Sequence, residues 1–266
     1  MASGQAGARD SATRPTGTRR IRICGIPVDI LTMEESIAAA CELIATGQPH
    51  QHVAINAAKV VAARRDPELR HIIESCAIAN ADGQSVVWAS RLLGPQLPER
   101  VTGIDFMLRM WEVAAAKGYR VFLLGSKRQT VLKAAEVARS QGVDIVGARD
   151  GYWTEEEEPA VVEEVARARP DLLFVGLPTP RKERFLHRHL YELNVPLAVG
   201  VGGSFDVVAG EVTRAPLWMQ KAGLEWLHRM RQEPRRLLRR YVLGNITFVA
   251  LVMREALAQR RRSSSS

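Results

Sequence analysis

The sequence lacks a hydrophobic run long enough to cross a membrane. A spanning helix needs about 20 apolar residues, whereas the longest apolar stretch, residues 242–253, is interrupted by Gly244, Asn245 and Thr247. The first twenty residues are small and polar, with several Gly and Pro and none of the apolar segment of a secretory signal. We therefore predict a disordered leader over residues 1–20 and a cytoplasmic protein that does not cross a membrane.

Cysteine and histidine are also scarce. The three cysteines, an odd number, are widely spaced along the chain, a pattern that favours reduced thiols over a disulfide framework or a zinc site. The six histidines form no HExxH motif, and His187 and His189 lie two positions apart on an expected helix, so their side chains point in different directions. We expect no metal site and no bound cofactor.

The chain is balanced in charge except in its last quarter. Residues 211–262 carry twelve Lys and Arg against four Glu, which accounts for the whole formal net charge of +8. Such an appendage favours polyanionic partners: nucleic acid, an anionic membrane surface or phosphorylated substrates. No nucleic-acid-binding motif accompanies the charge, so that alternative rests on charge alone. Trp218, Trp226 and the apolar residues 242–253 favour a membrane interface.

Continuous apolar runs alternate with amphipathic ones, which predicts an α/β domain: a Rossmann-like parallel sheet with helices on both faces. We expect this core over residues 21–210, a small helical basic appendage over 211–262 and a tail over 263–266. Pro216 and Pro234 should divide the appendage into short helices. The expected strands are 52–55, 76–79, 119–124, 144–146, 171–175 and 196–201, with a β-rich stretch over 21–30; the expected helices are 33–46, 57–65, 84–93, 130–141, 155–169 and 182–193.

In open α/β sheets, ligands bind beyond the carboxyl ends of the strands. Asp82 follows an expected strand there, and it either caps the next helix or acts as a general base whose pKa is raised by a partly apolar pocket. Asp206, in a glycine-rich turn, has the same two interpretations. Arg100 lies in a loop, where it either clamps a diphosphate or is a solvated charge. Asn56 also lies at a strand end.

Eight segments carry a family resemblance. In chain order they read INAAKVVAARRDPELR, ADGQSVVWASRLLG, LPERVTGIDF, VFLLGSKRQ, DGYW, PDLLFVGLPTPRKE, GVGGSFDVVAGEVTRAP and GLEWLHRMRQEPRRLLRRY. In this order they resemble the WecG/TagA/CpsF glycosyltransferase family, the bacterial N-acetylmannosaminyl and related transferases of glycosyltransferase family 26. The resemblance covers nearly the whole chain.

The resemblance implies inverting, metal-independent transfer of a sugar from a UDP-sugar to a polyprenyl-diphosphate-linked acceptor at the inner face of the bacterial plasma membrane. It implies that Asp82 is the catalytic base and Asp206 a second active-site carboxylate. It also places Asn56 in the pocket, Arg100 on the donor diphosphate and Tyr152 near the nucleotide. The implied diphosphate-binding arginines of the appendage are Arg229, Arg236 and Arg239.

The sequence departs from the family pattern at three positions. Ala54 stands where the family often has Thr, Pro178 where a small residue is usual, and Lys182 where Gln is usual. We expect Lys182 to lie beside the donor pocket, where it either favours an acidic sugar or adds to diphosphate binding. The donor is therefore left open among ManNAc, ManNAc uronate, glucose and a uronic acid. A catalytically impaired nucleotide- or lipid-binding protein is an alternative, and a homo-oligomer stays open.

Overall fold

The computed structural model describes residues 14–263 except 95, 222 and 233, and it describes only the backbone of residues 221, 229, 232, 234–243, 262 and 263. Residues 1–13 of the expected leader and 264–266 of the expected tail lie outside this description. The described end of the leader packs against the core, because the backbone amide and hydroxyl of Thr16 donate to Glu42 at 3.0 and 2.5 Å. The contact with the core therefore begins several residues before residue 21.

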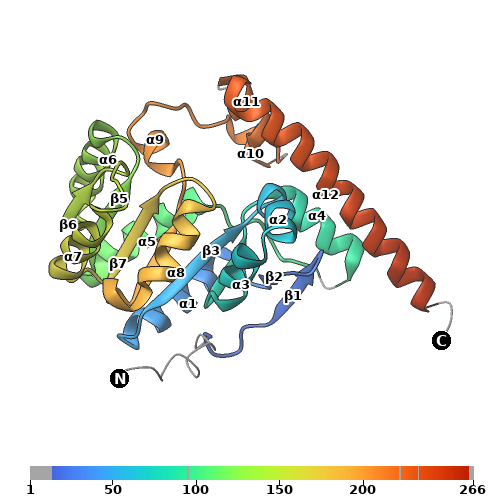
Figure 1. Cartoon of the computed structure of the whole chain (residues 1–266), viewed down its shortest axis with the longest axis horizontal. Helices are drawn as coiled ribbons and strands as arrows, with labels where there is room; N and C mark the ends of the chain where they lie inside the picture. Colours follow the sequence, from blue (N-terminus) through green and yellow to red (C-terminus); the bar gives the residue numbers. More distant parts are fainter. Residues whose placement is uncertain (1–13, 95, 222, 233, 264–266) are drawn as a thin grey trace.

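The core is a six-stranded parallel sheet, which confirms the predicted α/β class. Its strand order is β4-β3-β8-β7-β5-β6, and Figure 1 shows helices on both of its sides. From β3 the chain passes to β4, on the side of β3 away from β8. After β8 the chain turns to the opposite side and packs against α6 (Arg128–Ser140). The strands are β3 (His50–Ile55), β4 (Ile78–Ala81), β5 (Arg120–Gly125), β6 (Asp144–Arg149), β7 (Leu172–Gly176) and β8 (Leu197–Gly200).

The apolar alternation along β5 separates the two faces of the sheet. Val121 and Leu123 pack with α1, α5 and α6, whereas Phe122 and Leu124 pack with α7 and α8. A third cluster joins α2, α3, α4 and an N-terminal hairpin to the outer strands β3 and β4. The helices are α1 (Met33–Ala45), α2 (Ala57–Arg65), α3 (Pro67–Ser75), α4 (Gln84–Leu93), α5 (Gly103–Lys117), α6 (Arg128–Ser140), α7 (Glu158–Ala168) and α8 (Arg181–Leu193).

Two helices differ from the sequence-based expectation, whereas the expected β-rich stretch is confirmed. The β-rich stretch 21–30 is an antiparallel hairpin outside the main sheet, β1 (Arg20–Ile23) and β2 (Ile26–Asp29). Helices α3 and α5 were not predicted. Each begins at a side-chain cap: Asp66 accepts from the Leu69 amide at 3.0 Å, and Thr102 accepts from the Asp105 amide at 3.1 Å.

The chain after β8 continues through α9 (Ser204–Val208), α10 (Leu217–Lys221) and α11 (Glu225–Gln232) into α12 (Pro234–Ser263). The expectation of short helices is wrong for α12, which has 30 residues. Proline begins this helix, where its missing N–H costs nothing, and no later proline ends it. Figure 1 shows α12 running back along α2 and α4. No helix among the described residues is both long and apolar enough to span a membrane.

A buried ion cluster joins the helices α2 and α8. Glu183 Oε1 lies 2.7 Å from Lys59 Nζ and 3.1 Å from Lys182 Nζ, and all three side chains are at most 8% exposed. Burial opposes ionisation of Glu183, but the charges and hydrogen bonds of the two lysines outweigh it and lower the pKa of this carboxyl to about 2. Glu183 is therefore ionised at neutral pH, and its negative charge compensates the buried positive charges of Lys59 and Lys182.

We predict that Glu183→Gln lowers the free energy of unfolding by about 3–5 kcal/mol, because two buried ammonium groups lose their counter-ion. Urea denaturation at pH 7 measures this loss. Glu163→Gln, which removes an exposed ion pair with Arg167, is the matched control and should leave the midpoint unchanged. Because the pKa of Glu183 is lowered, its stabilisation is complete above pH 4.5 and is lost as the pH falls toward 2. A variant as stable as wild type at pH 7 would contradict the prediction.

Candidate active site

The ends of β3 and β4 bring Asn56 and Asp82 together. The parallel register pairs Ile55 with Ala81, so the residues that follow these two positions are neighbours. Asn56 caps α2 by accepting from the Lys59 amide at 3.1 Å, and its Nδ2 donates to Asp82 Oδ2 at 3.3 Å. One end of the Asn56 amide is thus fixed by the helix, and the other orients the carboxylate.

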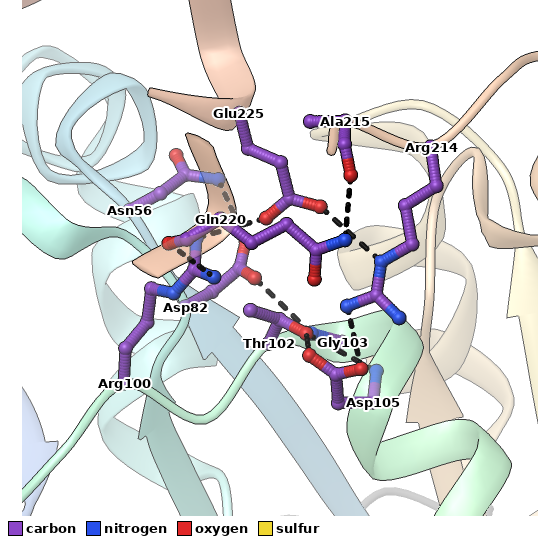
Figure 2. Close-up of polar contacts among 10 residues, drawn as sticks. All are labelled: Asn56, Asp82, Arg100, Thr102, Gly103, Asp105, Arg214, Ala215, Gln220 and Glu225. Carbon is purple, nitrogen blue, oxygen red and sulfur yellow. Dashed lines mark hydrogen bonds and ion pairs between the residues drawn. The ribbon is translucent and has the colours of Figure 1, made fainter. Parts of the chain in front are cut away.

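Asp82 does not cap the next helix. The N-cap of α4 is Gly83, and it has no side-chain cap hydrogen bond. The half-buried Asp82 carboxylate instead accepts from Asn56 and, through Oδ1, from the backbone amide of Gly103 at 3.1 Å. Of its two sequence-based interpretations, the capping role is therefore wrong. The carboxylate is held by two donors at the carboxyl ends of the strands (Figure 2).

Arg100 is not a solvated loop charge. Its loop follows the edge of β4, where the Val101 amide donates to the Ala81 carbonyl at 2.9 Å. The guanidinium is only 15% exposed: Nη1 lies 2.9 Å from Glu225 Oε2, and Nη2 donates to the Gln220 carbonyl at 3.3 Å. Arg100 therefore joins the loop beside Asp82 to both α10 and α11.

A second arginine completes this cluster. Arg214 lies in the segment between α9 and α10, and its Nη2 is 2.6 Å from Asp105 Oδ1 while its Nε is 3.5 Å from Glu225 Oε1. Asp105 stands in the first turn of α5 and also accepts from the Thr102 hydroxyl at 2.6 Å. Figure 2 shows Glu225 between the two guanidinium groups, above Asp82 and Gly103.

Asp206 and Tyr152 belong to a second group, at the ends of β5, β6 and β8. Asp206 on α9 accepts from the Ser126 hydroxyl at 2.7 Å. The backbone runs close here: Gly125 has φ +127°, and a Cβ on it would lie 2.6 Å from the Gly176 carbonyl carbon, so only glycine fits. The Gly151 amide donates to the Ser126 carbonyl at 2.9 Å. Tyr152 follows directly and is 71% exposed.

Lys182 lies in the buried cluster with Glu183 rather than at a pocket mouth. Its ammonium donates to Thr179 Oγ1 at 2.6 Å, and the residue is 6% exposed. The expectation that Lys182 presents a charge to an acidic donor sugar is not supported, because this ammonium is enclosed by protein. Ala54 is buried within β3, away from solvent. The side chains of Arg229, Arg236 and Arg239 lie outside the described residues.

The described part of the chain holds no group of three or more His, Cys, Asp or Glu side chains that could bind a metal ion. Among the described side chains, Figure 2 shows the guanidinium groups of Arg100 and Arg214 near Asp82. Sequence reasoning counted Arg214 and Glu225 only as charges of the appendage and gave them no role. One available signal was that Glu225 is among the four acids of this strongly basic segment.

Comparisons with known proteins agree with one another. The model of the glycosyl transferase WecG/TagA/CpsF family matches residues 21–262. The chain is also 34% identical over 182 residues to the N-acetylglucosaminyldiphosphoundecaprenol N-acetyl-beta-D-mannosaminyltransferase of Bacillus subtilis (strain 168). This match covers 68% of the present chain and 70% of the relative.

The turn between α10 and α11 covers the start of α4, next to Asp82. Gly223 is buried with φ +71°, and a Cβ on it would lie 2.5 Å from Gln84 Cγ. We predict that Gly223→Ala loosens this turn, because the methyl group meets the Gln84 side chain and the left-handed backbone costs about 1–2 kcal/mol for alanine. Limited trypsin digestion should cut α11 several-fold faster than in wild type.

Gly210→Ala is the control for this prediction. Gly210 has a similar φ of +73°, but a Cβ there would have nothing within 4 Å. This variant therefore has the backbone strain without the collision and should be cut in α11 at the wild-type rate. Equal cleavage of α11 in both variants would show that the contact with Gln84 does not hold the turn.

Proposed function

Because this chain belongs to the WecG/TagA/CpsF family of glycosyltransferases, we propose that it transfers a sugar from a UDP-sugar to a polyprenyl-diphosphate-linked acceptor in the synthesis of a bacterial cell-surface polysaccharide. The relative from Bacillus subtilis is named for transfer of N-acetylmannosamine to such an acceptor, so N-acetylmannosamine is the first donor sugar to test. The observation that carries the proposal is the double anchoring of the Asp82 carboxylate beside Arg100.

In the proposed mechanism, Asp82 is the general base. The amide of Asn56 and the backbone N–H of Gly103 hold one oxygen each and orient the carboxylate. Asp82 takes the proton of the acceptor hydroxyl while the oxygen attacks the anomeric carbon and the bond to UDP breaks on the opposite side. The configuration is thereby inverted, and the electron pair leaves with UDP. Arginine guanidinium groups neutralise the departing diphosphate without a metal ion.

Asp206 and Tyr152 are assigned to the nucleotide side of the donor. They lie at the ends of β5, β6 and β8, and of these three strands β8 is the one that neighbours β3, the strand that Asn56 follows. The exposed Tyr152 ring offers a face for uracil, and Asp206, oriented by Ser126, offers an acceptor for nucleotide hydroxyl or N–H groups. The donor would then lie across the carboxyl ends of the strands, with its nucleotide toward Tyr152 and its sugar toward Asp82.

The lipid-linked acceptor requires a membrane partner, and α12 offers a surface for one. Its inner face packs Phe248, Val252 and Ala256 into the core. Its outer face exposes four apolar residues at helical spacing together with Arg254, Arg260 and Arg261, a combination suited to an anionic lipid surface. We infer peripheral binding at the inner face of the plasma membrane. The four apolar residues are Ile246, Val249, Met253 and Leu257, which are 49–64% exposed.

We predict that Asp82→Asn lowers acceptor-dependent UDP release by about 10²–10⁴-fold, because the carboxamide cannot accept the proton. The assay uses UDP-ManNAc, UDP-ManNAc uronate, UDP-glucose and UDP-glucuronate with a polyprenyl-diphosphate-linked sugar, in EDTA. UDP-sugar affinity should stay within a few-fold of wild type. The control is Asp171→Asn, because Asp171 precedes β7 at the amino ends of the parallel strands, whereas Asp82 lies at their carboxyl ends. Wild-type turnover in Asp82→Asn would remove Asp82 as the base.

The outer face of α12 gives a separate prediction. We expect Met253→Gln/Leu257→Gln to weaken flotation with vesicles that contain anionic lipid by about tenfold or more, because two exposed apolar side chains no longer enter the interface. The matched control, Leu132→Gln/Tyr191→Gln, replaces exposed apolar residues on α6 and α8. If both double variants float like wild type, the outer face of α12 is not the membrane-binding surface.

A further inference from the structure

Two arginines from different parts of the chain converge on one carboxylate. Each guanidinium takes one oxygen of Glu225: Arg100 Nη1 lies 2.9 Å from Oε2, and Arg214 Nε lies 3.5 Å from Oε1. The three side chains are between 15 and 27% exposed, so their charges are screened less than at an open surface. Figure 2 shows this arrangement directly above Asp82. A pair of arginines in this geometry is a binding site for an anion with several oxygens.

We propose that Arg100 and Arg214 together bind a substrate diphosphate, and that Glu225 occupies their site until the diphosphate displaces it. This inference rests on the proposed function, in which both the UDP-sugar and the polyprenyl-linked acceptor carry a diphosphate. It adds Arg214 to the binding residues, and it assigns to Glu225 the role of an internal competitor for the same cations.

The core holds the Arg214 side chain independently of Glu225 and fixes the backbone next to Arg100. Arg214 is bound to Asp105, and Asp105 is itself held in the first turn of α5 by the Thr102 hydroxyl at 2.6 Å. Arg100 follows the edge of β4. Gly103, in the same loop, donates to Asp82. Asp105 therefore keeps Arg214 in place when the carboxylate of Glu225 leaves, and Arg100 keeps its hydrogen bond to the Gln220 carbonyl.

Glu225 differs from Asp105 because it belongs to the appendage. It is the first residue of α11, and among the described contacts its carboxylate is bound by Arg100 and Arg214. With Glu225 in place, two positive and two negative side chains balance within the cluster. A diphosphate carries more charge than one carboxylate and presents more acceptor oxygens, so the exchange strengthens the interaction with both arginines. It also frees the start of α11 from the core.

Isothermal titration calorimetry of the full-length chain in EDTA, with inorganic pyrophosphate as the minimal probe, tests this inference. We expect Glu225→Gln to tighten pyrophosphate binding about tenfold, because the competing charge is removed while the side-chain volume is kept. Arg214→Gln in the Glu225→Gln background should reverse the gain. Arg109→Gln is the matched control: Arg109 lies on α5, like Asp105, but pairs with the exposed residues Glu34 and Glu112, and its loss should leave pyrophosphate affinity unchanged.

Unchanged or weaker pyrophosphate binding by a folded Glu225→Gln variant overturns the inference, as does an unchanged affinity after the added Arg214→Gln. If Glu225→Gln does not fold, Glu225→Asp replaces it. The shorter side chain keeps the charge but no longer reaches both arginines, so tighter binding is again expected and unchanged binding contradicts it.

Further titrations with UDP and with farnesyl diphosphate identify the source of the diphosphate. Tightening by Glu225→Gln for UDP alone assigns the site to the donor, tightening for farnesyl diphosphate alone assigns it to the acceptor, and either result supports the inference. Failure of this inference is distinguishable from failure of the proposed function. If Glu225→Gln binds pyrophosphate tenfold more tightly but the wild-type protein shows no acceptor-dependent UDP release, the arginine site stands and the transferase activity is rejected. If UDP is released but Glu225→Gln does not change pyrophosphate affinity, the transferase activity stands and the arginine site is rejected.

Discussion

The parallel register of β3 and β4 is the constraint on which the candidate site depends. It sets Ile55 beside Ala81, so that the next residue of each strand is a polar neighbour of the other. Asn56 then has two tasks, since its oxygen caps α2 and its nitrogen holds the Asp82 carboxylate. A slip of register by one residue would separate these side chains and turn the strand faces over. The buried ion pair of Lys59 with Glu183 then ties α2, the helix that Asn56 caps, to α8.

The appendage is part of the site rather than a separate module. Arg100 binds both α10 and α11, and Gly223 lets the turn between them lie against Gln84 at the start of α4. Farther along, α12 packs beside α2, the helix that Asn56 caps. The same segment therefore covers the mouth of the site and ends on an outer face suited to a membrane. In the proposed function, this arrangement brings the lipid-linked substrate and the proposed base to one edge of the sheet.

The sheet and its polar edge could be predicted from sequence because both depend on local patterns. A buried strand followed by Asn56 or Asp82 is visible within a few residues, and parallel strands bring such ends together. The pairing of Arg100 with Glu225 could not be predicted, because 125 positions separate these residues and no local pattern links them. Lys182 was misplaced for a related reason. Its sequence context suggests a helix start near a pocket, but its burial depends on Lys59 and Glu183, which only the fold brings together.

The positive charge of the last quarter lies in two different environments in this fold. Arg214 turns inward and balances Asp105 and Glu225, so its charge acts at the mouth of the site. Arg254 and Arg260 lie exposed on the far part of α12, beside the apolar residues Met253 and Leu257. Salt should therefore screen the exposed charges of Arg254 and Arg260 strongly, and the partly buried ion pairs of Arg214 much less. Net charge alone cannot distinguish these two environments, because the distinction depends on which arginines form ion pairs within the protein and which face solvent.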